Sequence, residues 1–283
     1  MPVGTRRFES VEAFLDVCGP FLQAREPEHL LTLGIVGGAH APGERAEFGA
    51  LLSAIADDRV VATAVWTPPW NVILSEIDDP RAIDAVADAL TGDDLPGVHG
   101  PEEHAEAFAR AWCDRNAATY RPGMRQRSYA LETVVPPVGV SGSLRLARED
   151  DRAVMTEWMI GFDTEAMGSE AGRRDMTALV DELINASNRI AYIWEDGVPV
   201  SMCQATGPTP HGIRIGAVYT PPEHRRRGYA SALVAAASQA ELDRGRRWCF
   251  LFTDLANPTS NRIYRAIGYR PIRDVLLIRF DRL

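Results

Sequence analysis

The run of residues 215–231, IGAVYTPPEHRRRGYAS, constrains the fold more than any other part of the chain. An apolar segment ends in two prolines, and because neither can donate a ladder hydrogen bond, a strand has to stop there. Three consecutive arginines and a glycine then lead into an Ala-rich stretch that predicts a helix over 228–243. A helix N-terminus presents unpaired N–H groups and about half a positive charge. This turn therefore predicts a phosphate or pyrophosphate site.

Charge is distributed unevenly along the 283 residues. The net charge is −9, and all 30 basic side chains are Arg. Residues 1–212 carry 17 Arg and 33 acidic residues, whereas residues 213–283 carry 13 Arg and 6 acidic residues. The negative total argues against a general nucleic-acid-binding protein. The basic C-terminal quarter predicts contact with a polyanion, and a chance cluster of solvated arginines is the alternative.

The cysteines and the hydropathy pattern exclude other classes of protein. Cys18, Cys113, Cys203 and Cys249 lie far apart and form no cluster with His, so they predict neither a disulfide framework nor a metal site. No stretch of about 18 apolar residues occurs. The first residues, MPVGTRRFESVEAF, lack an apolar signal core. We therefore expect a cytoplasmic protein with no membrane or nucleic-acid partner.

A stretch rich in Pro, Gly and Ser at 136–143, PPVGVSGS, predicts a linker. We place domains at 1–136 and 144–283, with the linker at 137–143. Helices and strands mix in both halves, so the fold class is α/β, more strictly α+β, with mixed and mostly antiparallel sheets flanked by helices.

Apolar periodicity and turn residues predict the individual elements. In the first half we expect helices at 8–22, 28–36, 80–91 and 102–115, and strands at 47–55, 59–66, 71–77 and 124–135. In the second half we expect helices at 151–162, 171–187, 228–243 and 258–267, and strands at 144–148, 190–195, 199–206, 213–219, 248–253, 269–273 and 275–280. Asp196-Gly197 is a hairpin turn signal.

Residues 144–283 resemble a GCN5-related N-acetyltransferase (GNAT) domain. The family's Arg/Gln-x-x-Gly-x-Gly/Ala motif matches Arg225, Gly228 and Ala230. The resemblance implies that backbone amides of 225–230 hold the pyrophosphate of coenzyme A, and that the preceding strand end pairs with the pantetheine arm. The implied cofactor contacts are Val218, Tyr219, Thr220, Arg225, Arg226, Arg227, Gly228, Tyr229, Ala230 and Ser231.

The segment TDLANPTSNRIY, residues 253–264, matches a second part of the family pattern. The resemblance implies that Asn257 and Ser260 contact the cofactor. It also implies that Tyr264 lies near the thioester sulfur and protonates the leaving thiolate. The alternatives are structural: Asn257 before Pro258 is an ordinary helix N-cap, and Tyr264 shares a helix face with apolar residues.

Acyl transfer requires a neutral amine. For an alkyl amine of pKa about 10.4, neutrality at pH 7 costs about 4.6 kcal/mol, so a general base should matter. Asp254 and Glu157 are the leading candidates, followed by Glu165 and His224, and surface or capping roles are the alternative. By resemblance, the backbone N–H of Val218 binds the carbonyl oxygen.

An acceptor pocket in this fold is usually built from the first two helices of the domain. These helices would supply the following acidic and aromatic residues: Glu157, Trp158, Phe162, Asp163, Glu165, Glu170, Asp175, Asp181 and Glu182. An acidic pocket would suit a cationic amine, and solvated helix faces are the alternative.

These patterns predict an N-acetyltransferase that moves an acetyl group directly from acetyl-CoA, its co-substrate, to a primary amine of a small molecule, peptide or aminoacyl compound, without a metal. A non-catalytic acyl-CoA-binding or regulatory module, or a transferase using a longer acyl-CoA, stays open. Residues 1–136 resemble a degenerate GNAT-like domain, in which Trp66, Trp70 and Trp112 line a groove or pack the core. A homodimer is also left open.

Overall fold

The computed structural model describes residues 2–39, 47–167, 175–185 and 189–282, which form two compact units. Unit 1 contains residues 1–129, 252–258 and 271–283, and unit 2 contains residues 130–251 and 259–270. The C-terminal strand therefore belongs to the same unit as the N-terminal half of the chain.

Unit 1 is built around a mixed sheet with the strand order β1-β2-β3-β4-β5-β12-β6. Strands β4 and β5 run parallel, whereas β12 is antiparallel to β5. The elements are β1 (Gly4–Arg7), α1 (Val11–Gln23), α2 (Leu30–Ala39), β2 (Ala50–Ala56), β3 (Arg59–Trp66), β4 (Val72–Leu74), α3 (Ala82–Ala89), β5 (Gly97–Pro101), α4 (Glu102–Asn116), β6 (Ala118–Leu131) and β12 (Arg270–Arg282).

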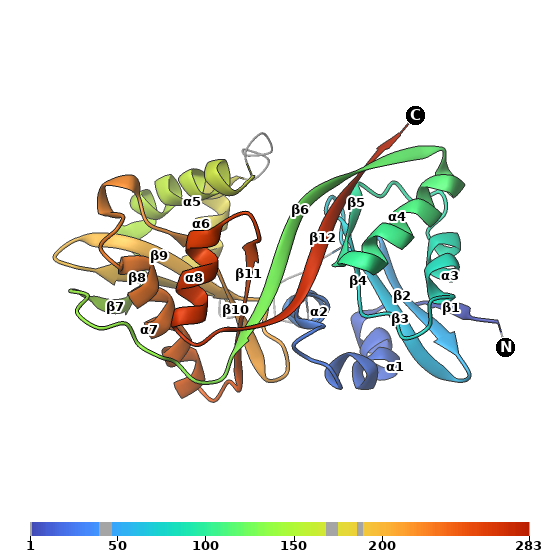
Figure 1. Cartoon of the computed structure of the whole chain (residues 1–283), viewed down its shortest axis with the longest axis horizontal. Helices are drawn as coiled ribbons and strands as arrows, with labels where there is room; N and C mark the ends of the chain where they lie inside the picture. The colour runs from blue at the N-terminus through green and yellow to red at the C-terminus, as the bar shows by residue number, and fades with distance from the viewer. Residues whose placement is uncertain (1, 40–46, 168–174, 186–188, 283) are drawn as a thin grey trace. The chain divides into compact units, whose positions relative to one another are not determined.

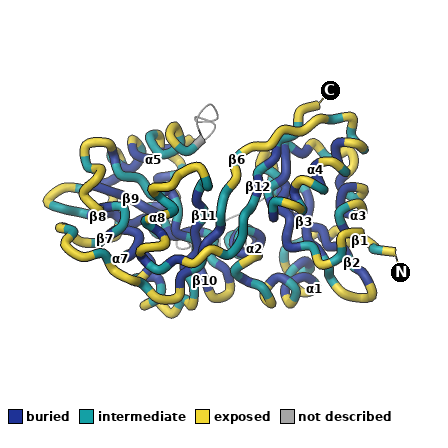
Figure 2. Tube along the Cα trace, viewed as in Figure 1, coloured by how far each residue is buried: buried dark blue, intermediate teal, exposed yellow. Residues whose placement is uncertain are grey.

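Alternating side chains of the unit 1 sheet pack against helices on its two faces. Leu51 joins an apolar cluster with Phe14 of α1, and the neighbouring Leu52 joins a second cluster with Phe108 and Trp112 of α4. Helices α3 and α4 lie side by side over this second cluster (Figure 1). Figure 2 shows β2 and β3 largely buried and the start of β6 exposed. Unit 1 is thus a three-layer arrangement with the sheet in the middle.

Unit 2 has a sheet with the strand order β11-β10-β9-β8-β7, in which β10 and β11 are parallel and the other neighbours antiparallel. The elements are β7 (Ser143–Leu146), η1 (Glu149–Asp151), α5 (Arg152–Met167), α6 (Met176–Asn185), β8 (Ile190–Glu195), β9 (Pro199–Thr206), β10 (Gly212–Tyr219), η3 (Pro222–His224), α7 (Tyr229–Asp243), β11 (Trp248–Asp254) and α8 (Pro258–Ala266).

Strand β8 shows how the two faces of the unit 2 sheet are covered. Ile193 packs in an apolar cluster with Trp158 of α5 and Val180 of α6. The adjacent Tyr192 points to the other face, where its hydroxyl donates to the buried carboxylate of Glu241 in α7 at 2.6 Å. Because successive strand side chains alternate, α5 and α6 cover one face and α7 the other.

The predicted fold class is confirmed, because helices flank mixed sheets in both units. The sequence patterns missed β1 and β5, and they split β12 into two strands. Gly97 begins β5, which pairs with β12, and β12 approaches it so closely that a Cβ there would lie 2.1 Å from the carbonyl oxygen of Ile278. Asp274 read as a break in β12, but the guanidinium of Arg127 donates to it at 2.5 and 2.7 Å, so the strand continues.

The helix predicted at 28–36 also differs from the structure. Helix α2 continues through Gly37-Gly38 to residue 39, because its apolar residues pack rather than fray at the glycines. The helix predicted at 171–187 is observed as α6 within the described residues, and Glu170 lies outside them. The domain boundary predicted at 137–143 stays a prediction.

Because β12 closes the core of unit 1, we expect Leu276→Ala to lower the free energy of unfolding by about 2–5 kcal/mol. Leu276 is only 2% exposed, and Phe280 of the same strand stacks on Trp112 with ring centroids 4.5 Å apart. Urea unfolding followed by Trp fluorescence measures the change. Arg282→Ala, which removes an exposed ion pair with Asp94, is the control and should cost less than about 0.5 kcal/mol. A loss below about 1 kcal/mol for Leu276→Ala would contradict this role of β12.

Candidate active site

Strand β10 is irregular immediately before the arginine-rich turn. Its parallel ladder with β11 covers Gly212–Arg214, and its register with β9 shifts between Gly216 and Tyr219. Within the shift, Ala217 adopts a left-handed backbone conformation with φ 45°. Such a bulge re-aims the backbone of a strand and is a strained conformation for a residue with a Cβ. Val218 therefore lies within the bulge, the pairing with β9 resumes at Tyr219 opposite Met202, and Thr220 follows the strand.

The N-terminus of α7 is left without a side-chain cap. Gly228 is the N-cap residue, with φ 85°, and no side chain accepts a hydrogen bond from the first turn. The first helical bond runs from the N–H of Ala232 to the carbonyl of Gly228 at 3.0 Å. The N–H groups of residues 229–231 consequently have no acceptor within the helix. Together with the helix dipole they form a site suited to an anion.

The three arginines of the turn differ in their contacts. The guanidinium of Arg225 donates to Glu165 of α5 at 2.6 Å and to the carbonyl of Thr220 at 2.8 Å, and it lies over the ring of Tyr219. The bond to Glu165 raises the pKa of Arg225. Arg226 and Arg227 are exposed. Arg225 thus braces the turn against α5, while the other two arginines are accessible to a ligand.

Contacts that sequence patterns did not indicate fix the end of β10. The hydroxyl of Ser201 donates to the carbonyl of Tyr219 at 2.9 Å and bonds the hydroxyl of Thr220 at 2.8 Å. A Cβ on Gly161 of α5 would lie 2.5 Å from the hydroxyl oxygen of Tyr219. A glycine within a predicted helix was the one available signal for this close approach.

Tyr264 of α8 is nearly buried, with 9% of its surface exposed. Burial raises the pKa of Tyr264 to about 12, partly offset by a hydrogen bond with Ser260. Full proton transfer from such a phenol to a thiolate of pKa about 8.5 is uphill by about 4.8 kcal/mol. Its environment suits Tyr264 to donating a hydrogen bond rather than a whole proton.

Asp254 and Asn257 shape the turn before α8, and both belong to unit 1. The carboxylate of Asp254 accepts from the N–H of Ala256 at 2.8 Å, and its carbonyl accepts from the N–H of Asn257 at 3.0 Å. These bonds describe a structural role for Asp254. Its proposed role as a base, and the cofactor contact of Asn257, stay predictions.

The other candidate bases lie in different settings within unit 2. Glu157 is exposed on α5, whereas its neighbour Trp158 is buried in the core. Glu165 is engaged by Arg225 at 2.6 Å. His224 belongs to η3, with its ring centroid 6.5 Å from that of Tyr229. Of these three candidates, Glu157 is the carboxylate that faces solvent without an ion pair among the described contacts.

The predicted acidic acceptor pocket is largely neutralised by local partners. Three of its carboxylates are ion-paired to arginines of unit 2: Glu165 with Arg225, Asp181 with Arg152, and Glu182 with Arg189. Asp175 accepts from the N–H groups of Thr177 and Ala178 and so caps α6. Phe162 packs partly against the core, and Asp163 is half-buried. The acceptor pocket therefore stays a prediction.

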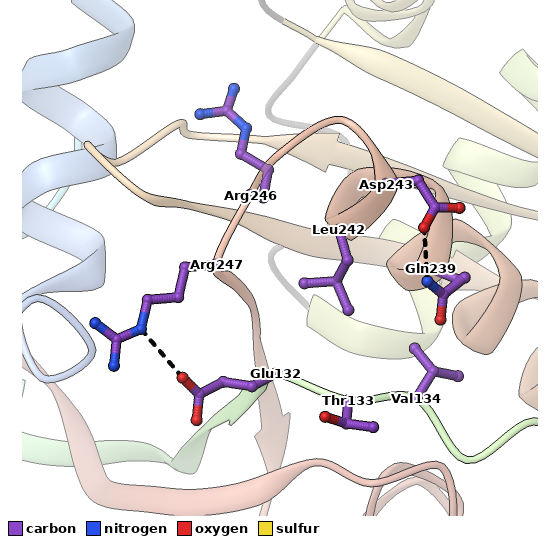
Figure 3. Close-up of a pocket in the computed structure, with 8 residues that line it drawn as sticks. All are labelled: Glu132, Thr133, Val134, Gln239, Leu242, Asp243, Arg246 and Arg247. Atoms are coloured by element: carbon purple, nitrogen blue, oxygen red, sulfur yellow. Dashed lines mark hydrogen bonds and ion pairs between the residues drawn. The ribbon is translucent and has the colours of Figure 1, made fainter.

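A surface hollow of about 520 Å³ lies at the opposite end of α7 from the arginine-rich turn (Figure 3). Its lining residues are Glu132, Thr133, Val134, Gln239, Leu242, Asp243, Arg246 and Arg247. Arg247 donates to Glu132 at 3.2 Å, and Gln239 donates to Asp243 at 2.8 Å. Since α7 has 15 residues and rises about 1.5 Å per residue, this hollow lies about 20 Å along the helix from the candidate site.

Unit 1 repeats the order of elements but not the chemistry of the turn. After the parallel strand β4, the loop 75–81 carries three acidic residues, Glu76, Asp78 and Asp79, and a single arginine, Arg81. Asp79 accepts from the N–H of Arg81 at 3.0 Å, just before α3. Acidic side chains beside this helix N-terminus disfavour a phosphate there.

The tryptophans of the first half mainly serve the core of unit 1. Trp112 is 1% exposed and Trp66 is 9% exposed, and both belong to the same apolar cluster. Trp70 is 43% exposed, and its carbonyl accepts from the indole N–H of Trp66 at 2.8 Å.

Two further findings concern the described residues alone. None of their helices is long and apolar enough to cross a membrane. In the same ranges, no group of three or more His, Cys, Asp or Glu side chains is arranged to hold a metal ion.

Comparisons with known proteins agree with the observed fold. Residues 199–277 match the family model described as FR47-like protein. No curated protein matches the sequence. A GCN5-related N-acetyltransferase from Kribbella flavida has a TM-score of 0.59 at 16% identity, with 89% of this chain and 95% of that chain covered.

Two more solved structures match over nearly the whole chain. A Drosophila protein has a TM-score of 0.67 at 15% identity, with 98% of both chains covered. A tandem GNAT protein from the clavulanic acid biosynthesis pathway has a TM-score of 0.58 at 14% identity, with 99% of this chain and 98% of that chain covered. At these identities the likeness establishes the fold, which is that of tandem GNAT proteins. The resemblance inferred from residues 225–230 is confirmed in this respect.

A side chain at Gly228 should lower the stability more than a side chain at Gly245, although both glycines have a positive φ. Its φ is 85° and a Cβ would lie 2.9 Å from a methyl of Val140, whereas Gly245 has φ 93° and open space around it. We expect Gly245→Ala to cost about 1–3 kcal/mol of stability from φ alone, and Gly228→Ala about 1–3 kcal/mol more from crowding. Chemical unfolding of both variants measures the difference, and equal losses would show that the Val140 contact is unimportant.

Proposed function

We propose that this chain, which has the fold of the tandem GNAT proteins, is an N-acetyltransferase that moves an acetyl group from acetyl-CoA to a primary amine. The observation that carries the proposal is the uncapped N-terminus of α7, which follows a bulged strand and carries two exposed arginines. A helix of 15 residues with free first-turn N–H groups is suited to a pyrophosphate. The GNAT fold supports acyl transfer in general terms.

The residues around the turn fit the cofactor. Backbone N–H groups of 228–231, with Arg226 and Arg227, would hold the pyrophosphate, and the end of β10 would pair with the pantetheine arm. Gly216 has open space where a Cβ would project, which leaves room beside β10. When bound, acetyl-CoA supplies an activated acetyl thioester.

The groups of unit 2 would then serve the attack of the amine. The N–H of Val218, within the bulge, would polarise the acetyl carbonyl. Tyr264 would donate a hydrogen bond to the sulfur, since burial keeps its hydroxyl protonated at neutral pH. Glu157, exposed on α5, is the proposed acceptor of the ammonium proton, directly or through water.

The ion pairs of the acidic residues near α5 and α6 help to predict which class of amine accepts the acetyl group. Several acidic side chains near α5 and α6 are held by arginines, so few remain to act as a strong base. An α-amine has a pKa of about 7.7–8.0, so its neutral form at pH 7 costs only about 1 kcal/mol, against about 4.6 kcal/mol for an alkyl amine. This arithmetic supports an α-amino group of an aminoacyl compound or peptide over a lysine-like side chain.

Isothermal titration with acetyl-CoA tests the cofactor. We expect one molecule bound per chain, because loop 75–81 of unit 1 is acidic where unit 2 has arginines. The double variant Arg226→Ala/Arg227→Ala should weaken binding at least about 10-fold through the loss of charged hydrogen bonds. Arg246→Ala, at the far end of α7, is the matched control and should bind normally. Absence of saturable binding to the native chain would refute the proposal.

Tyr264→Phe tests the role of the phenol. Loss of a hydrogen bond to developing charge should lower kcat about 10–100-fold while leaving the dissociation constant for acetyl-CoA unchanged. Because the pKa of Tyr264 is raised to about 12, its hydroxyl stays protonated below that value. The pH–rate profiles of both forms should therefore have the same shape between about pH 6 and 10. A falling limb near pH 9 in the native enzyme alone would show that Tyr264 titrates there and transfers its proton.

The arginine-paired carboxylates also favour a second candidate, a non-catalytic acyl-CoA-binding module, because they leave the amine with little base assistance. A panel of α-amines and alkyl amines, assayed by release of free thiol from acetyl-, propionyl- and succinyl-CoA, separates these functions. Turnover of an α-amine supports the transferase, and the best donor defines the acyl group. Tight cofactor binding without turnover of any amine supports the module.

A further inference from the structure

The segment before β7 lies against the candidate cofactor turn. We call residues 139–142 the strap. Val140 of the strap packs on Gly228, because a Cβ on that glycine would lie 2.9 Å from a methyl of Val140. The indole N–H of Trp194 in β8 donates to the carbonyl of Ser141 at 2.8 Å. The strap is therefore fixed to the β8 end of the sheet and to the N-cap residue of α7.

Asp196, in the turn between β8 and β9, joins the strap to the helix. One oxygen of its carboxylate accepts from the hydroxyl of Ser141 at 2.6 Å and from the hydroxyl of Tyr229 at 2.6 Å. Tyr229 is the first residue of α7 and is 5% exposed. The bonds from Ser141 and Tyr229, with the nearby charge of Arg227, lower the pKa of Asp196. Asp196 is thus a charged acceptor shared by the strap and the first turn.

Other helices of the chain secure their first turns differently. Ser10 accepts from the N–H of Ala13 at the start of α1, and Asp175 accepts from the N–H groups of Thr177 and Ala178 at the start of α6. Each of these caps consumes the N–H groups that an anion would need. In α7 the N-cap is Gly228, which offers no such acceptor. The bond from Tyr229 to Asp196 holds the turn through a side chain and leaves its N–H groups unused.

We propose that Asp196 and the strap position the first turn of α7 for the pyrophosphate of acyl-CoA, with Asp196 as the positioning residue. This inference rests on the proposed function and adds to it a role for the segment between the two halves of the sequence. A helix end without an N-cap frays, and fraying would disperse the N–H groups that face the anion. The strap removes that freedom before the ligand arrives, so less order has to be gained on binding.

The test compares two ligands and two variants. Asp196→Ala removes the acceptor of both hydroxyls, whereas Asp196→Asn keeps an oxygen in its place. We expect Asp196→Ala to raise the dissociation constant for CoA about 5–20-fold, in line with the loss of two hydrogen bonds, and Asp196→Asn to stay within about 3-fold of the native value. The dissociation constant for S-acetyl-pantetheine, which lacks the pyrophosphate, should not change in either variant. The kcat at saturating acetyl-CoA should also stay constant.

Asp243→Ala is the matched control, since it removes an acidic residue from the other end of α7. Unchanged CoA binding in Asp196→Ala would overturn the inference. An equal loss for S-acetyl-pantetheine would overturn it too, because general destabilisation affects both ligands.

Hydrogen exchange of the ligand-free protein makes the test independent of the proposed function. In Asp196→Ala the amides of 232–235 should lose protection, and in Asp196→Asn they should keep it. Unaltered protection in Asp196→Ala would overturn the inference. If the native chain binds no CoA, the proposed function fails, and exchange still decides whether Asp196 holds the turn.

Discussion

The first turn of α7 has no side-chain cap on its N–H groups, and contacts from other parts of unit 2 hold it instead. A side-chain cap would stabilise the turn and block it at the same time. The constraints therefore come from outside the helix. Arg225 is held by Glu165 of α5, Tyr229 by Asp196, and Gly228 lies against Val140. The bulge at Ala217 turns the end of β10 toward the same region of unit 2.

Unit 1 has the same order of elements with a different loop at the equivalent place. In each unit a helix connects two parallel strands, α3 between β4 and β5 and α7 between β10 and β11. In unit 1 the loop before the helix carries Asp78 and Asp79, and Asp79 binds the N–H of Arg81. These carboxylates place negative charge beside the start of α3, where unit 2 has three arginines. Unit 1 has its own apolar core, which includes Leu276 of the C-terminal strand β12.

The sequence predicted the structure best where neighbouring residues alone determine it. The prolines after β10, the arginines and the Ala-rich helix predicted the turn before α7, and most elements lie within a few residues of their predicted bounds. The sequence patterns failed where distant segments matter. Gly97 belongs to a strand that pairs with β12 opposite Arg279, and Asp274 lies within β12, where Arg127 binds it. Asp196 read only as half of a hairpin turn, since no pattern links it to Ser141 and Tyr229.

The absence of Lys sharpens the argument about the reaction. Arg stays protonated at every working pH, so an Arg–carboxylate pair cannot be relieved by loss of the cation's proton. Glu165, Asp181 and Glu182 are each paired with such an arginine in unit 2. Glu157 is exposed on α5 and has no ion pair among the described contacts. Under the proposed function, an acceptor amine that is already near neutral would need the least help from a base. Arg225 would then have two effects, because its contacts with Glu165 and the carbonyl of Thr220 hold the turn before α7 and also occupy a carboxylate beside it.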